Sequence, residues 1–387
     1  MFLGPMLSLH NSLTNKLEPF TPISADGSVN MYVCGITPYD EPHVGHARAA
    51  VFYDILYRYL GVLGYRVNFI QNVTDIDDKI IERSHATSTS WRDIGLHNEA
   101  IYDKAMLELN VLPHGVFRAT AFIDEMADDI RELLAADKAY RTDDGIYFRT
   151  NDEGRLSNRK KRDQRSVDSD FVLWKYAKPG EPSWRPDGFL AGRPGWHTEC
   201  ATMSMHLTHG RLDIHGGGND LLFPHHENEL ALMEALWSTE AKYWVHSGLL
   251  TDATGQKMGK SLGNHVNLSG LLRRYGGQAL RHYFMQNNYR KPMRFVETHL
   301  TTAQKHADEL KSFLASYPAA GSDWEEDAFY DLAFRSAMDA NINTAKALVI
   351  MNDWRAAIKS RNITLMSPSF LKALWVLGLD THGIMVM

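Results

Sequence analysis

Residues 30–73 read NMYVCGITPYDEPHVGHARAAVFYDILYRYLGVLGYRVNFIQNV and carry the patterns of a strand, a helix and a second strand. Residues 30–34 are apolar and extended in character, and a glycine follows them. Apolar residues then recur at helical spacing over 44–63, and residues 67–73 are rich in strand formers. A βαβ unit of this kind has parallel strands, so the stretch predicts an α/β fold with a parallel sheet covered by helices.

The composition of the whole chain is that of a globular protein. Its 387 residues are 44% hydrophobic and 23% charged, which argues against a disordered, collagenous or coiled-coil protein. We find no apolar run of about 18 residues and no signal-peptide pattern, so we expect no membrane span. The net charge of -6 does not indicate a nucleic-acid binder, although a local basic patch remains compatible with it. Two cysteines form no disulfide framework and suit the reducing cytoplasm.

The patterns beyond the βαβ unit predict a split α/β domain followed by helices. Residues 77–137 have a helical pattern, and residues 151–170 are polar, as in a loop or insertion. A glycine turn at 216–218 follows a short predicted strand, and a helix is expected over 221–237. After about residue 299 the pattern is almost entirely helical.

Two short segments are candidates for binding phosphate. His43-Val44-Gly45-His46 lies where the first helix begins, and a helix N-terminus attracts anions. Gly45 allows a ligand to approach the backbone, and both imidazoles can donate hydrogen bonds. Lys257 and Lys260 lie in a predicted loop, where they can neutralise charge on a triphosphate. Each segment alone also fits a solvated surface, whereas the two together at strand ends favour a nucleotide site.

Four scattered residues are candidates for binding zinc. His225 and Glu229 are four positions apart on a predicted helix, so they share one face. With Cys34 and Cys200 they would form a tetrahedral set of soft and borderline ligands. The spacing differs from the close pairs of a zinc finger, so two small buried cysteines or one disulfide remain alternatives.

Six segments together resemble the cysteinyl-tRNA synthetase family of class I aminoacyl-tRNA synthetases. They are MYVCGITPYDEPHVGHAR, QNVTDIDDKI, DFVLWKYAKPGEPSW, GRPGWHTEC, LDIHGGGNDLLFPHHENE and KMGKSLGN, in that order. The resemblance covers most of the chain, from about residue 30 to 379. It implies a Rossmann-like catalytic domain split by a connective insertion and followed by an α-helical domain. It also implies ATP-dependent activation of L-cysteine to cysteinyl adenylate and transfer to tRNA(Cys).

The resemblance also implies roles for individual residues. Those of the catalytic and ATP-binding set are His43, Gly45, His46, Lys257 and Lys260. The matching zinc ligands are Cys34, Cys200, His225 and Glu229, which would hold one Zn²⁺ that recognises the substrate thiol. The matching substrate-binding positions are Thr37, Thr74, Trp196 and Asp220, with Asp220 expected on the substrate ammonium and a buried core position as the alternative for Trp196. ATP is expected to bring Mg²⁺.

By the same resemblance, the catalytic domain spans 1–265 with an insertion at about 115–190. A linker that contacts the tRNA stem follows over 266–300, and a helical domain spans 301–387. Full synthetases carry a further anticodon-binding domain that we do not find, so we expect a shortened form. The basic loop Arg155–Arg165, with six Lys or Arg residues, could contact the tRNA acceptor end or be a solvated loop. We expect a monomer.

Two alternative functions remain at this point. A shorter relative, the mycothiol cysteine ligase, joins cysteine to a small amine such as glucosaminyl-inositol, and residues 34–40 (CGITPYD) resemble it closely. The HHENE segment at 225–229 instead resembles the synthetases. A non-catalytic paralogue is the third possibility, and the presence of His43, His46, Lys260 and all four metal candidates argues against it.

Overall fold

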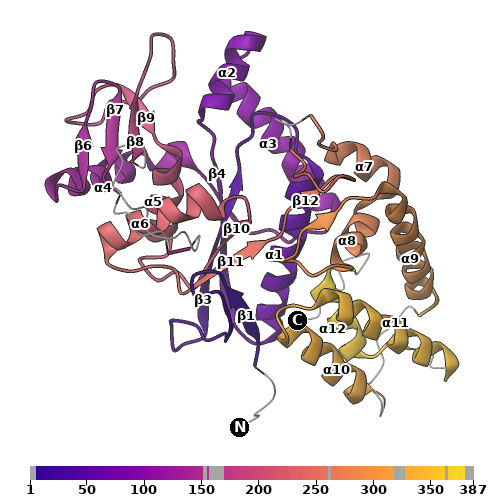
Figure 1. Cartoon of the computed structure of the whole chain (residues 1–387). Coiled ribbons are helices and arrows are strands. Elements are labelled where there is room, and N and C mark those ends of the chain that lie inside the picture. Colours follow the sequence, from indigo (N-terminus) through magenta and orange to yellow (C-terminus); the bar gives the residue numbers. More distant parts are fainter. Residues whose placement is uncertain are drawn as a thin grey trace.

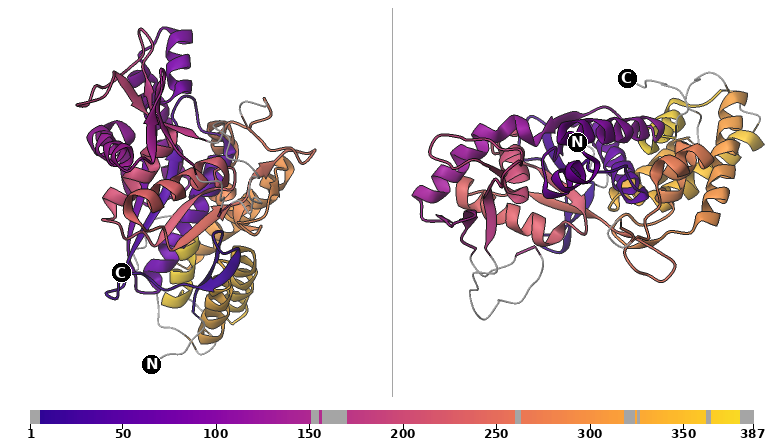
Figure 2. Two further views of the ribbon diagram at one scale, coloured as in Figure 1. Left: turned by 60° about the vertical axis from the view of Figure 1, so that its left-hand side comes forward. Right: turned by 90° about the horizontal axis from the view of Figure 1, so that it is seen from above.

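The computed structural model describes residues 6–150, 155–156, 170–259, 263–317, 324, 327–361 and 365–379. A central parallel sheet lies between two other parts (Figure 1). A small antiparallel sheet with its helices lies on one side, and the C-terminal helices lie on the other. The views in Figure 2 show the same succession of parts along the molecule.

The parallel sheet confirms the predicted fold class. Its order is β11 (Tyr243–Ser247), β10 (Ile214–Gly218), β3 (Ser28–Ile36), β4 (Arg66–Val73) and β5 (Gly115–Arg118). Every neighbouring pair of these strands is parallel. The predicted βαβ unit is β3, α1 (Val44–Val62) and β4, with bounds close to those expected from the sequence.

Helices cover both faces of this sheet because side chains alternate along each strand. Met31 and Val33 of β3 join the core that α1 forms on one face. Tyr32, between them, points to the other face and packs with α5 (Trp196–Leu207) and α6 (Glu227–Trp237). The strand carries apolar residues on both sides, which is why it reads as a continuous apolar run.

The helical pattern predicted over 77–137 is only partly correct. It contains α2 (Asp78–Thr87), α3 (Trp91–Glu108), the short helix η1 (Ala119–Phe122) and α4 (Ile123–Ala135). Between α3 and η1 lies β5, an edge strand of the parallel sheet. Four residues are too few to show a strand period, so tertiary pairing with β4 defines this strand. The expected start of the insertion, at about residue 115, coincides with β5 and stays a prediction.

The glycine turn expected at 216–218 is wrong, because β10 continues through Gly218. A Cβ atom on Gly216 would lie 2.6 Å from the ring of Tyr53 on α1. A Cβ on Gly217 would lie 2.8 Å from the His226 ring. The glycines therefore serve close packing across both faces of an extended strand. The helix expected over 221–237 is α6, preceded by the irregular turn η3 (Leu222–His226).

A separate antiparallel sheet lies in the region expected to be the insertion. Its strands are β6 (Ala139–Arg141), β7 (Gly145–Phe148), β8 (Phe171–Tyr176) and β9 (Gly192–Pro194), in that order. Its apolar side packs against α4 in a core of its own. Lys175 of β8 and Arg193 of β9 form ion pairs with Asp78 of α2, which connect the insertion to the main domain.

The remaining elements are two small sheets and a run of helices. The strands are β1 (Ser8–Asn11), β2 (Lys16–Pro19), β12 (Leu250–Thr251) and β13 (Met293–Arg294). The helices are α7 (Leu268–Tyr275), α8 (Gly277–Met285), α9 (Glu297–Ser316), α10 (Asp327–Asp339), α11 (Thr344–Ser360) and α12 (Pro368–Leu377). The last four follow the helical pattern predicted after about residue 299, whereas α7 and α8 lie before it and are not predicted. Among the helices of the described ranges, none combines the length and the apolar character needed to cross a membrane.

Candidate active site

The candidate residues gather at the carboxyl ends of the parallel strands. From β3 the chain passes through α1 to β4 on one side, whereas β10 pairs with the other side of β3. The direction of winding thus changes between β3 and β10. Ligands of open α/β sheets bind outside the carboxyl ends of strands at such a point. Cys34 and Gly218 lie near the ends of these two strands.

The four side chains selected as metal ligands lie together in the structure. Cys34 comes from β3, Cys200 from α5, His225 from the η3 turn and Glu229 from α6. One ligand atom from each lies within 4.8 Å of the others. Cys200, His225 and Glu229 are at most 1% exposed. Both cysteines are free thiols, which rules out the disulfide alternative.

The donor atoms of this cluster are those that a zinc ion prefers, and they lie close together. Tetrahedral zinc with bonds of about 2.0–2.3 Å places its ligand atoms about 3.3–3.8 Å apart. Cys34 Sγ lies 3.5 Å from Glu229 Oε1, which is within this range. His225 Nε2 lies 2.8 Å from the same oxygen, which is shorter than the range and is an ion-pair distance. Within the described part of the chain, His225 Nε2 and Glu229 Oε2 have ion-pair contacts, at 2.8 Å to Glu229 Oε1 and at 2.9 Å to His215 Nε2, but no partner in hydrogen-bond geometry. Buried polar atoms in this situation call for a water or an ion.

The charges of the cluster also accommodate a cation. Burial disfavours the carboxylate of Glu229, but His225 and His215 hold its pKa well below the ordinary value. Burial also disfavours a charged His225, yet Glu229 and Cys200 raise its pKa to about 10. Burial raises the pKa of the Cys34 thiol, and Cys200 and Glu229 add to this effect. Without a metal, a proton on His225 therefore supplies the positive charge that an ion would otherwise supply.

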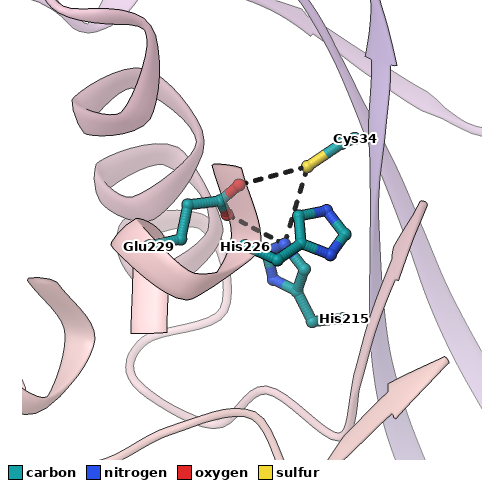
Figure 3. A group of neighbouring side chains, drawn as sticks. All are labelled: Cys34, His215, His226 and Glu229. Carbon is teal, nitrogen blue, oxygen red and sulfur yellow. Dashed lines mark hydrogen bonds and ion pairs between the residues drawn. The ribbon is translucent and has the colours of Figure 1, made fainter. Parts of the chain in front are cut away.

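Two further histidines contact the cluster, and the sequence prediction does not include them. His215 of β10 places Nε2 2.9 Å from Glu229 Oε2 and 3.6 Å from Cys34 Sγ (Figure 3). His226 Nδ1 lies 2.8 Å from His246 Nε2 of β11, behind the cluster. Burial lowers the pKa of His226 and His246, so both rings are neutral. Their signal in the sequence is their place in LDIHGGGNDLLFPHHENE, beside the chosen ligands.

The two histidines of the phosphate-binding candidate cap helix α1. Gly45 N–H donates to His43 Nδ1 at 3.0 Å, and His43 N–H donates to His46 Nδ1 at 3.1 Å. The rings stack with their centroids 3.9 Å apart. Since Nδ1 accepts in both rings, each neutral imidazole carries its proton on Nε2. The helix start therefore presents two N–H donors in a fixed orientation.

We call Cys34, Cys200, His225 and Glu229 the metal-type cluster. A small cavity between the sheet and this helix reaches Cys34 of that cluster. Cys34, His46, Gly217 and Gly218 are among the residues that line it, and its volume is about 50 Å³. The phosphate candidate and the thiol candidate therefore adjoin one space at the end of the sheet. This proximity is what a reaction between a nucleotide and a small thiol would need.

We call residues 257–260 the lysine segment. Its Lys257 forms an ion pair with Asp220. Lys257 Nζ lies 2.9 Å from Asp220 Oδ2, and both side chains are exposed, at 47% and 40%. Asp220 follows β10, and Lys257 pairs with Thr251 of β12 through a backbone bridge. Lys260 lies outside the described residues.

A protein-family model described as the class I (C) tRNA synthetase catalytic domain matches residues 20–305. The chain is 39% identical over 366 residues to the cysteine–tRNA ligase of Dehalococcoides mccartyi, covering 90% of this chain and 79% of that protein. It is 38% identical to the ligase of Thermococcus gammatolerans, covering 95% and 84%. The chain belongs to the class I cysteinyl-tRNA synthetase family. The predicted resemblance is thereby confirmed, and the chain is a member of a ligase family.

Solved synthetase structures support the fold of this family member. The methionyl-tRNA synthetase of Mycobacterium tuberculosis with methionyl adenylate superposes with a TM-score of 0.63 at 14% identity. That alignment covers 90% of this chain and 89% of the other. The LeuRS of Agrobacterium radiobacter in its complex with tRNA and LeuAMS gives 0.64 at 10% identity, covering 93% and 84%. At these identities the likeness concerns the fold alone.

The remaining substrate-binding candidates of this synthetase-family chain lie around the same edge. Thr37 and Thr74 follow β3 and β4, and Thr74 N–H donates to Ile36 O at 2.9 Å. The Trp196 ring stacks on His225 with the centroids 4.1 Å apart. Trp196 is 39% exposed, so the alternative of a buried core position is wrong. Its indole thus lies against a ligand of the cluster.

Proposed function

We propose that this chain activates L-cysteine with ATP and transfers the cysteinyl group to tRNA(Cys). The observation that carries the proposal is that Cys34 of the metal-type cluster and His46 of the histidine-capped helix line one cavity. The relatives named cysteine–tRNA ligase, at 38–39% identity over 90–95% of the chain, support it. They also favour tRNA over a small amine as the acceptor.

The first step needs positioning and charge stabilisation rather than a protein nucleophile. The cysteine carboxylate attacks the α-phosphate of ATP, the bond to the β-phosphate breaks, and pyrophosphate leaves. His43 and His46 donate from Nε2 to phosphate oxygens, and Gly45 keeps the helix start open. Lys257 and Lys260 stabilise the leaving pyrophosphate, and Mg²⁺ accompanies ATP.

The metal-type cluster serves thiol recognition. Cys34, Cys200, His225 and Glu229 would hold one zinc ion, which when bound favours a thiolate over the hydroxyl of serine. His215 and the stacked Trp196 orient the ligands Glu229 and His225. A site built around one specific interaction rejects analogues that lack it.

The other substrate contacts follow from position. Thr37 and Thr74 would border the adenylate, and Trp196 would cover the cysteine side chain. Asp220 would bind the substrate ammonium, which replaces Lys257 as its partner and releases that lysine toward phosphate. The same carboxylate thus serves two cations in succession.

For the acceptor, the basic loop supplies fewer free charges than its composition indicates. Arg155 forms ion pairs with Glu234 and Glu240 of the main domain. The other five basic residues of the loop lie outside the described residues.

We propose the domain limits 1–265, 266–300 and 301–387, with the insertion now starting after Arg118, and a monomeric cytoplasmic protein. A mass measurement in solution tests the monomer.

The test is cysteine-dependent exchange of pyrophosphate into ATP by the zinc-loaded protein, followed by charging of tRNA(Cys). We expect exchange with cysteine, no exchange with serine, and formation of cysteinyl-tRNA. Absence of exchange would contradict cysteine activation. Exchange with transfer only to glucosaminyl-inositol would contradict the tRNA acceptor and select the ligase alternative.

A further inference from the structure

Arg48 is a buried charged residue that the proposed mechanism does not use. It lies on α1 two residues after His46 and is 4% exposed. Its guanidinium donates to backbone carbonyls of two separate segments. Nη1 donates to Gly248 and Leu249 at 2.8 and 2.7 Å, and Nη2 donates to Asn288, Tyr289 and Lys291 at 3.3, 3.3 and 2.6 Å.

The arrangement indicates a geometric role rather than charge pairing. In the ranges that the structure describes, no ion pair includes Arg48. Burial lowers its pKa to about 10, which leaves it protonated at neutral pH. A guanidinium is a rigid fork with donors on both sides, so one side chain can hold two chain segments at a fixed spacing. A lysine ammonium has no such fork.

The two segments lead directly to the lysine segment. Residues 248–249 run into β12, which pairs with β13 after residues 288–291. Met258 N–H donates to Leu250 O at 2.9 Å, and Thr251 forms a bridge with Lys257. The position of β12 therefore determines where the backbone of Lys257 lies.

The other end of the lysine segment is also joined to the start of α1. Val44 N–H donates to Val266 O at 3.0 Å, and Leu268 N–H donates to Pro42 O at 3.2 Å. Residues 250–266 thus begin beside Arg48 and end beside His43. Both ends are tied to the helix whose first turn carries the two histidines.

We propose that Arg48 is a positioning residue for the reaction with ATP, which sets the place of Lys257 relative to His43 and His46. The inference rests on the proposed function, since it concerns the same site. The guanidinium acts through the backbone of β12 and touches neither ATP nor cysteine. Its removal should impair the use of ATP while leaving cysteine recognition unchanged, because the metal-type cluster lies on the opposite face of the sheet.

The test compares Arg48→Lys with Arg58→Lys. Arg58 lies on the same helix, is 1% exposed, and contacts Asp54 and the carbonyls of Trp375 and Asn110 instead. In pyrophosphate exchange, Arg48→Lys should raise KM for ATP and lower kcat, so that kcat/KM for ATP falls by about tenfold or more. KM for cysteine should stay within about twofold of the wild-type value. Arg58→Lys should lower the melting temperature without raising KM for ATP relative to KM for cysteine.

A second variant and a second readout keep the proposal falsifiable. A Cβ atom on Gly248 would lie 2.3 Å from Lys291 O, so Gly248→Ala should spread the same segments with Arg48 intact and reproduce the KM split. Amide hydrogen exchange of Met258 and Met293 should accelerate in Arg48→Lys. An equal KM effect in Arg58→Lys, or unchanged exchange of these amides, would overturn the proposal. If the wild type shows no pyrophosphate exchange, the proposed function fails, and the amide readout still decides the role of Arg48.

Discussion

Position 45 illustrates at the scale of one residue how the site depends on a missing side chain. A Cβ atom there would lie 2.7 Å from Cε1 and 2.9 Å from Nδ1 of the His43 ring. That ring occupies the space because it folds back to accept the N–H of residue 45. The sequence suggests that Gly45 lets a ligand approach the backbone. The structure adds that Gly45 makes room for the His43 imidazole.

Gly45→Ala is therefore expected to displace the His43 ring and slow cysteine-dependent pyrophosphate exchange by about tenfold to a hundredfold. The matched control is Gly61→Ala in the same helix, where a Cβ meets nothing within 4 Å. The control should keep full activity and gain about 0.5–1 kcal/mol of stability. Unchanged kinetics in Gly45→Ala would contradict the role of His43 geometry.

Cys34→Ser tests the metal assignment at the same scale. Loss of one thiol should lower the zinc content of the purified protein and its affinity for zinc, because a hydroxyl is a poorer ligand for this metal. Atomic emission and competition with a chelator measure both quantities. His97→Ala, on the exposed side of α3, should retain the zinc of the wild type. A serine variant with wild-type zinc affinity would show that the cluster does not hold the ion.

At the scale of one element, helix α5 contacts both the metal-type cluster and helix α4. One side of it carries Cys200 toward the metal-type cluster, and another meets α4. There the carboxylate of Asp129, 6% exposed, accepts from Thr202 Oγ1 at 2.6 Å and lies 3.2 Å from His206 Nε2. Burial raises the pKa of Asp129 despite these two contacts. A buried acid of α4 thus contacts the same helix that carries Cys200.

This raised pKa predicts a pH-dependent stability. Where the folded-state pKa exceeds the unfolded one, the contribution is full below the ordinary carboxyl pKa and is lost as pH rises through the raised value. The melting temperature of the wild type relative to Asp129→Asn should therefore be higher near pH 4 than near pH 7. Asp128→Asn, exposed on the same helix, should show no such trend. A wild-type advantage that grows with pH would have the wrong sign.

At the scale of the whole molecule, a buried ionic network joins the catalytic sheet to the C-terminal helices. Asp54 of α1 pairs with Arg58 and with Arg281 of α8. Arg281 Nε donates to Leu377 O at the end of α12, and Arg58 donates to Trp375 O. Helix α1 begins with the phosphate-binding candidate, and residues in its middle bind α8 and α12.

Asp54→Asn should lower the free energy of unfolding by about 3–5 kcal/mol, because two buried guanidinium groups lose their carboxylate. Denaturant unfolding followed by tryptophan fluorescence measures the loss. Arg66→Gln removes the exposed pair with Asp26, whose side chains are 69% and 62% exposed, and should cost less than about 1 kcal/mol. Similar losses of unfolding free energy in both variants would show that the buried network stabilises the fold no more than an exposed ion pair does.

Much of the site could be predicted because chemically distinctive residues stand in recognisable segments. Cys34, Cys200, His225 and Glu229 are selected from their motifs, and the structure brings them together. Residues without such a motif escape prediction. The carbonyl acceptors of Arg48 lie 200 to 243 positions away, and nothing local marks them. The short strand β5 escapes for the same reason, since its partner β4 defines it.

Local patterns were enough for the parallel α/β class, the helix that begins at His43 and the helical C-terminal part, because side-chain periodicity follows from backbone geometry. Packing of distant segments settled the rest. It extended β10 through its glycines, since α1 and His226 approach that strand too closely for a Cβ. It also added His215 to the cluster and Arg48 to the lysine segment. Contacts of this kind arise only when the chain has folded, because they join groups that sequence order keeps apart.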